Sequence, residues 1–323
     1  MAFPPAAGQL LINLSPASTA RFLESGEKLI WEILSAKLKG FCNSGFKVAE
    51  EEARKAKKIA DENKVWDAIV DAAFVDQKLA KPSQSEIIGA VQAATDPRDV
   101  LVGAAGSLPG DLHKLWRVRD PLGYHMEYAF SCMGYEIAAG LGVARADSSR
   151  TPIVMMGDGS YLMMHTELVT AVAEGLKFIV VLVQNHGYAS IGHLSEDIGS
   201  QRFGTKYRFR DAKSNNHESG DVLPVDLATN AESLGMNVIR IAESPSAIAD
   251  LSAAMKIAKA HPTATLIHIN SDPLLYAPGG EAWWEVPIPE ISTLESTQKA
   301  YANYTQARKA QKKYLGKGSS ERS

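Results

Sequence analysis

The chain has 323 residues, of which 45% are hydrophobic and 22% charged, with a net charge of −3. This composition is typical of a globular protein that buries one large or two ordinary cores. The slight negative charge gives no reason to expect nucleic acid or an acidic membrane as partner. No apolar run reaches the length of a membrane span. The two cysteines lack a Cys-x-x-Cys spacing, which suits a reducing, cytoplasmic location.

Residues 1–80 combine a short apolar run with charged helical segments. Residues 10–14 are apolar, but they lack a basic leader and a clear cleavage site, so a signal peptide is not expected. Apolar residues recur with helical spacing over 21–39, and 48–77 form a long, highly charged helical region. Its runs of glutamate and lysine predict a solvated helix face.

Alternating strands and helices after residue 80 predict an α/β fold. Ser83 is placed to cap a helix over 86–94, and residues 100–103 predict the first strand. The alternation continues to a strand at 266–270, which indicates a doubly wound parallel sheet with helices on both faces. A last helix is expected over 294–315, before a basic tail.

The most informative stretch is residues 154–188. It predicts a buried strand, a Gly-Asp-Gly-Ser turn at 157–160, a helix over about 163–174 and a second buried strand over 178–183. Because such strand ends meet at the carboxyl edge of a parallel sheet, Asp158 and Asn185 are expected side by side. Their oxygens suit Mg²⁺ or Ca²⁺ rather than zinc.

The turn itself favours a diphosphate ligand. Gly157 and Gly159 let the backbone approach a phosphate closely, and the helix that follows Ser160 points its N-terminus at that phosphate. A lone Asp-Gly or Asn-x-Gly is usually only a turn. It is the pairing of the two across a single helix that favours a metal-bridged diphosphate.

This arrangement resembles the signature of thiamine-diphosphate-dependent enzymes. The resemblance implies that Asp158, Asn185 and the carbonyl of Gly187 ligate Mg²⁺, and that thiamine diphosphate is the cofactor. Gln184 stands where the first of the two asparagines of the family usually lies. Since the second asparagine is the ligand, the metal site is expected to be retained.

The same resemblance assigns further cofactor contacts. It implies that Gly106 and Ser107 touch the diphosphate, that Met133 wedges between the two cofactor rings, and that the carbonyl of Ser131 accepts a hydrogen bond from the cofactor amino group. Taken without the resemblance, Ser107 is an ordinary loop serine and Met133 a gap-filling core methionine.

A narrower resemblance covers about residues 45–311. Segments 104–112, 127–136, 199–205 and 282–286 are similar to the C-terminal half of the trihydroxycyclohexane-1,2-dione hydrolases of myo-inositol catabolism. It implies the thiamine-diphosphate- and Mg²⁺-binding half of a hydrolase that cleaves a C–C bond in a polyhydroxylated cyclic 1,2-diketone.

The hydrolase resemblance also divides the chain. It implies a central-domain remnant with a charged helical connector over 1–80, the diphosphate domain of the thiamine-diphosphate-binding fold over 81–292, and a C-terminal helix with a basic tail over 293–323.

The activating glutamate of the family is missing from this chain. In the family it comes from a separate pyrimidine-binding domain, usually of another subunit, and no glutamate in residues 1–80 has a similar context. We therefore expect the chain to need a pyrimidine-domain chain or a homo-oligomer and to be inactive alone. Two alternatives stay open: a truncated, non-catalytic cofactor-binding module, or a subunit of a thiamine-dependent decarboxylase or carboligase.

Four other features have plainer interpretations. Cys132 has no base nearby in sequence and is expected to be an inert, packed thiol. His186 and His193 follow the metal turn and are candidate proton shuttles, although histidines in polar loops are more often plain surface. Residues 140–145 begin like a dinucleotide fingerprint but lie in a helix-like run, so a nicotinamide site is not expected. The cationic and aromatic run 202–210 is expected to be a loop and strand that faces substrate or a neighbouring subunit rather than nucleic acid.

Overall fold

The computed structural model describes residues 43–217, 219–279 and 286–311, with side chains from residue 52 onward. The expected helix over 21–39, the apolar run 10–14 and most of segment 282–286 lie outside these ranges. The chain divides into two compact units, one from residues 1–185 and 225–278 and the other from 186–224 and 279–323. Each unit is described separately below.

The first unit is built on a parallel sheet. Six strands lie in the order β2-β1-β3-β4-β6-β5, and every neighbouring pair is parallel. The strands are β1 (Val100–Gly103), β2 (Tyr124–Met126), β3 (Pro152–Gly157), β4 (Ile179–Gln184), β5 (Asn237–Arg240) and β6 (Thr265–Asn270). The doubly wound parallel sheet expected from the sequence is confirmed.

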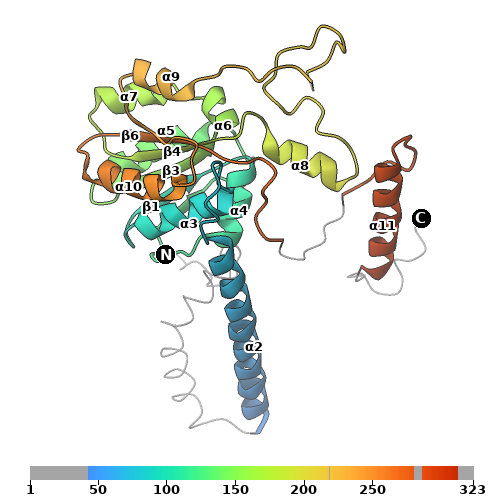
Figure 1. Ribbon diagram of the computed structural model, residues 1–323. Coiled ribbons are helices and arrows are strands. Elements are labelled where there is room, and N and C mark those ends of the chain that lie inside the picture. Colours follow the sequence, from blue (N-terminus) through green and yellow to red (C-terminus); the bar gives the residue numbers. More distant parts are fainter. Residues whose placement is uncertain (1–42, 218, 280–285, 312–323) are drawn as a thin grey trace, which may run out of the picture. The chain divides into compact units, whose positions relative to one another are not determined.

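Helices cover both faces of this sheet, as Figure 1 shows. One face carries α3 (Gln84–Ala94), α4 (Ser107–Leu115) and α10 (Ala247–Ala260). The other carries α5 (Tyr135–Ala146), α6 (Asp158–Met163), α7 (Glu167–Ala173) and α9 (Leu227–Ser233).

Side chains of the central strands alternate between the two hydrophobic cores. In β3, Ile153 and Met155 join the core under α3, α4 and α10, whereas Val154 and Met156 join the core on the opposite face. This is the two-residue period of a strand. Since helices bury both faces, β3 and β4 are continuous apolar runs, which is why the sequence predicted them well.

Helix α2 (Asn43–Ala73) packs on the first unit through its C-terminal part. Trp66 Nε1 donates to the carbonyl of Lys114 at 3.0 Å, and Arg117 pairs with Asp67 at 3.1 Å and Asp71 at 2.6 Å. The residues with described side chains before Asn63 are exposed, as expected for a solvated helix face.

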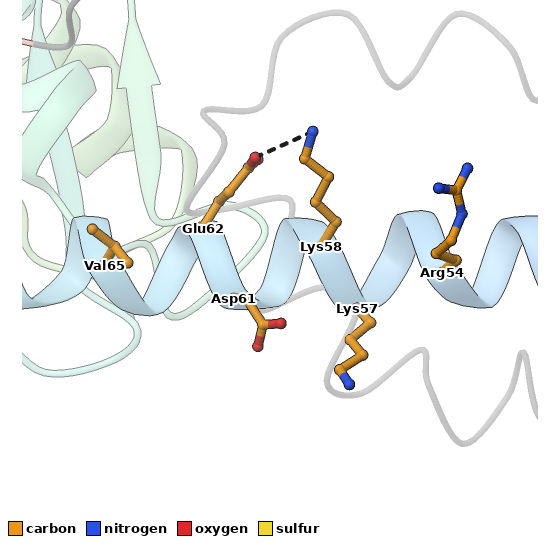
Figure 2. Close-up of a pocket in the computed structure, with 6 residues that line it drawn as sticks. All are labelled: Arg54, Lys57, Lys58, Asp61, Glu62 and Val65. Atoms are coloured by element: carbon orange, nitrogen blue, oxygen red, sulfur yellow. Dashed lines mark ion pairs between the residues drawn. The ribbon is translucent and has the colours of Figure 1, made fainter.

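A shallow pocket lies along this exposed part of α2 (Figure 2). All of its lining side chains come from the one helix: Arg54, Lys57, Lys58, Asp61, Glu62 and Val65. Lys58 and Glu62 form an ordinary i,i+4 ion pair with 3.6 Å between charged atoms. Among the described residues, neither buried polar groups nor a second element line this pocket, so it is not chosen as the candidate site.

The second unit contains α8 (Ala189–Asp197) and α11 (Glu295–Ala310). The hydroxyls of Ser296 and Thr297 donate to the carbonyl of Gly199 at 2.6 and 2.8 Å, which ties the start of α11 to the end of α8. Residues 202–210 are irregular apart from isolated bridges of Lys206 to Gly187 and of Arg208 to Val222.

One predicted helix is wrong in its boundaries. The helix expected over about 163–174 is two short helices: α6 begins earlier, at Asp158, and ends at Met163, and α7 begins at Glu167. Met164 has an extended backbone, with φ −159° and ψ 89°, which stops α6 and redirects the chain. The cap at Ser83 is confirmed, and Glu86 completes a capping box.

None of the helices within the described residues combines the length and the apolar character that a membrane crossing requires.

Candidate functional site

The strand order places a topological switch point between β1 and β3. These strands are neighbours, but the chain leaves β1 towards β2 on one side and leaves β3 towards β4 on the other. This reversal is a topological switch point, and open α/β sheets bind ligands beyond the carboxyl ends of the strands at such points. Gly106 and Ser107 follow β1, and Asp158 follows β3.

The structure brings Asp158 and Asn185 together, as the sequence predicted. Asp158 is 1% exposed. One of its carboxylate oxygens accepts from the amide of Gly159 at 3.1 Å and the other from the amide of Asn185 at 3.3 Å. The carboxylate thus joins the end of β3 to the end of β4, in the first unit.

Asn185 has the features of a metal ligand. Its side-chain oxygen is buried and has no hydrogen-bond partner among the described residues. A buried acceptor without a partner costs about 1–3 kcal/mol, which a bound cation would offset. The described residues contain no cluster of three His, Cys, Asp or Glu side chains that could hold a metal. One carboxylate with neutral oxygens suits Mg²⁺, which usually keeps water or phosphate in its shell.

Gln184 stands where the family usually has an asparagine, and its side chain makes hydrogen bonds within the fold. It is the last residue of β4 and is 2% exposed. Its Oε1 lies 2.7 Å from Nε2 of His268, and its Nε2 donates to the carbonyl of Val225 at 3.1 Å. The side chain therefore ties the end of β4 to β6 through His268 and to the segment before α9 through Val225.

The loop after β1 bends through Gly106, whose φ is +93°. This left-handed conformation favours glycine. Ser107 begins α4, and its hydroxyl donates to Oε1 of Gln84 at 3.0 Å. The contact with Gln84 was not foreseen, and the predicted contact of Gly106 and Ser107 with a diphosphate stays a prediction.

The loop of residues 127–134 carries Ser131 and Met133. Ser131 has φ +51°, an unusual conformation for a residue other than glycine. The carboxylate of Glu127 accepts from the amides of Phe130 at 2.9 Å and Cys132 at 2.8 Å, and these bonds hold the pKa of Glu127 below its ordinary range. The expectation of a packed Cys132 is wrong, because this loop leaves the thiol exposed.

Glu136 is the main residue that the sequence reasoning missed. It lies in the first turn of α5 and is completely buried. Its carboxylate accepts from the amides of Ala105 at 3.3 Å and Gly134 at 2.9 Å. Burial raises the pKa of Glu136, and these hydrogen bonds oppose that effect.

Three predicted residues belong to the second unit: His186, Gly187 and His193. His186 has φ +59°, and its carbonyl accepts from the amide of Tyr207 at 2.9 Å. Nε2 of His193 lies 3.6 Å from a carboxylate oxygen of Asp197, one turn further along α8. The metal role of Gly187 and the proton-transfer roles of the histidines stay predictions.

Comparison with known proteins gives the class to which this fold and site belong. Residues 104–269 match the family described as thiamine pyrophosphate enzyme, C-terminal TPP binding domain. The chain belongs to this family of thiamine-diphosphate-binding proteins, as the sequence resemblance implied. The match includes the residues after β1, the loop 127–134, Asp158 and Asn185.

The chain is also similar to particular members of the class. It is 39% identical over 228 residues to 3D-(3,5/4)-trihydroxycyclohexane-1,2-dione hydrolase 2 of Bacillus cereus, and this match covers 71% of the chain and 35% of the relative. A second Bacillus cereus hydrolase of the same name, from strain AH820, is 38% identical over 239 residues, or 73% of the chain and 36% of the relative. The chain thus spans about a third of the length of these relatives.

A solved structure is similar as well. The thiamine diphosphate-dependent 4-hydroxybenzoylformate decarboxylase of Rhodococcus jostii RHA1 aligns with 60% of this chain and 33% of its own, at 20% identity and a TM-score of 0.49.

Proposed function

We propose that this chain binds the diphosphate of thiamine diphosphate through Mg²⁺ at the switch point between β1 and β3. The observation that carries the proposal is the pairing of the buried Asp158 carboxylate with Asn185, whose buried amide oxygen has no partner among the described residues. Asp158, Asn185 and the carbonyl of Gly187 are the proposed protein ligands of the metal. Gly157, Gly159, Ser160, Gly106 and Ser107 are the proposed diphosphate contacts.

The proposed reaction is hydrolytic C–C cleavage of a polyhydroxylated cyclic 1,2-diketone, as in inositol catabolism. When bound, thiamine diphosphate would supply nucleophilic carbon chemistry towards a carbonyl of the substrate. This chain would orient the cofactor, with Met133 between its rings and the carbonyl of Ser131 on its amino group. The identity of 38–39% to the dione hydrolases supports this substrate class.

The catalytic glutamate would come from a pyrimidine-binding domain on another chain, and the complete site would form in a cytoplasmic oligomer. A catalytic residue of this chain is not assigned, and His186 is the candidate for proton transfer. The alternative of a cofactor-binding module without catalysis stays open, because no glutamate in residues 1–80 has the context of the activating glutamate. A thiamine-dependent decarboxylase or carboligase subunit shares the same metal signature and is distinguished by its substrate.

Calorimetric titration of thiamine diphosphate into the full chain tests the proposal. We expect binding that needs Mg²⁺ and that Asp158→Ala and Asn185→Ala each weaken by at least about tenfold, because each removes a ligand of the metal. Asn237→Ala is the matched control. It removes an asparagine of β5 whose side chain donates to Thr265 at 3.1 Å, away from the carboxyl ends of β1 and β3. Binding that is absent, independent of Mg²⁺, or lost equally in the control would refute the proposed site.

A further inference from the structure

We infer that Glu136 is a positioning residue that holds two segments beside the switch point in a fixed relative position: the loop after β1 and the loop before α5. The inference rests on the proposed function and extends it to a residue that bonds to backbone amides of the loops around the site and makes no contact with the cofactor itself.

The amide donors to Glu136 come from two separate parts of the sequence. Oε1 accepts from the amide of Ala105, which immediately precedes the proposed diphosphate contacts Gly106 and Ser107. Oε2 accepts from the amide of Gly134, which follows Met133. One side chain therefore links the loop after β1 to the loop before α5.

The environment of Glu136 distinguishes this role from direct contact with a ligand. The side chain has no exposed surface, and both carboxylate oxygens are occupied by protein donors. Burying a carboxylate is costly unless hydrogen bonds compensate, so this position has a clear requirement for an acceptor with two oxygens. An apolar replacement would leave the amides of Ala105 and Gly134 without their acceptor.

The packing near Gly134 leaves little freedom for another arrangement. Gly134 has φ +94°, and a Cβ built there would lie 2.6 Å from Cβ of Met164, just after α6. The backbone at the start of α5 thus packs closely against the residue that follows α6. If Glu136 no longer held its donors, the loop after β1 and the loop with Met133 would shift relative to Asp158.

Two measurements on the full chain test the inference, using Glu136→Gln and Glu136→Ala. Hydrogen–deuterium exchange without cofactor is followed in peptides that cover 100–107 and 127–137. Calorimetric titration with Mg²⁺ gives the affinity for thiamine diphosphate. We expect exchange to be about tenfold faster in both peptides and affinity to be about tenfold weaker, with the smaller effect in Glu136→Gln because it retains one acceptor oxygen.

Glu86→Gln is the matched control. Glu86 is also a glutamate near a helix start, is 2% exposed, and accepts from two backbone amides, those of Gln77 at 2.7 Å and Ser83 at 2.8 Å. Its donors precede α3 and lie outside both the loop after β1 and the loop before α5. We expect Glu86→Gln to speed exchange near residues 77–86 and to leave the affinity within about twofold of wild type.

The outcomes separate the inference from the proposed function. Unchanged exchange in the two peptides of Glu136→Gln would overturn the inference, whether or not the cofactor binds. Faster exchange with wild-type affinity would overturn it as well, because the loops would then move without effect on the site. If the wild-type chain binds no thiamine diphosphate, the proposed function fails, and the exchange comparison with Glu86→Gln alone decides whether Glu136 holds the segments together.

Discussion

Ser131 has a left-handed backbone that costs a non-glycine residue about 1 kcal/mol or more. Its two neighbours, Phe130 and Cys132, donate their amides to Glu127, and these bonds stabilise that conformation. Strained residues of this kind often occur at functional sites. The strain lies at the residue whose carbonyl the family resemblance assigns to the cofactor amino group, and Glu127 is the side chain that maintains it.

Acidification is therefore expected to weaken this loop. The pKa of Glu127 is lower in the folded chain than its ordinary value of 4.5, because the amide of Phe130 and then that of Cys132 favour the carboxylate. Its contribution is complete above about pH 4.5 and is lost as the pH falls through the lower, folded-state pKa. Exchange of residues 127–134 should rise below about pH 4.5 beyond the intrinsic rate change in wild type and should show no such additional rise in Glu127→Gln. The same pH dependence in the variant would contradict this role.

Sequence patterns predicted the candidate site residues that directly follow a recognisable strand. They did not predict residues whose environment is set by segments far away in the sequence. Asp158 and Asn185 were found because each follows an apolar strand. Glu136 was missed because a glutamate in a helix-like segment usually faces solvent, and its donor Ala105 lies 31 residues away. Cys132 was expected to be packed, whereas its exposure depends on the loop that Glu127 shapes.

The central elements were predictable because their burial is simple. Strands β3 and β4 are buried on both faces, and Ser83 with Glu86 is a local start signal for α3. The boundary between α6 and α7 was missed because the glycines at 157 and 159 suggested a turn, whereas Asp158 already begins a helix. Where the helix stops depends on Met164, whose extended backbone has no local sequence signal.

Close packing of α5 on β3 gives a sharp stability prediction. A Cβ built at Gly140 would lie 2.4 Å from Cγ2 of Val154, a stiff, completely buried side chain. Gly140→Ala is expected to destabilise the fold by about 1–3 kcal/mol through overpacking. Gly142→Ala, in the same helix with no atom within 4 Å of its Cβ position, should stabilise it by about 0.5–1 kcal/mol through helix propensity.

Urea unfolding of the two variants measures both effects, since the midpoint shifts in opposite directions at an unchanged slope. Equal shifts in the same direction would show that α5 does not approach β3 as closely as this packing requires.

The missing activating glutamate bears on how a complete active site would form. Asp158 and Asn185 belong to the first compact unit, and Gly187 belongs to the second. The domain division at residues 80 and 292 that the resemblance implies stays a prediction. No glutamate in residues 1–80 has the context of the activating glutamate, so we expect dione cleavage to require a group from another chain.

Complementation tests whether this chain is half of such an active site. We expect the full chain alone to cleave no cyclic 1,2-diketone. Mixing it with the part of the Bacillus cereus hydrolase that the match leaves uncovered should produce cleavage that needs thiamine diphosphate and Mg²⁺. The reason is that the activating glutamate and the diphosphate site would then come from different chains. Asp158→Ala in this chain should abolish the activity of the mixture, whereas Gly142→Ala should leave it unchanged, because that position has no atom near it. Cleavage by this chain alone, or a mixture that remains active with Asp158→Ala, would contradict the division of the site between two chains.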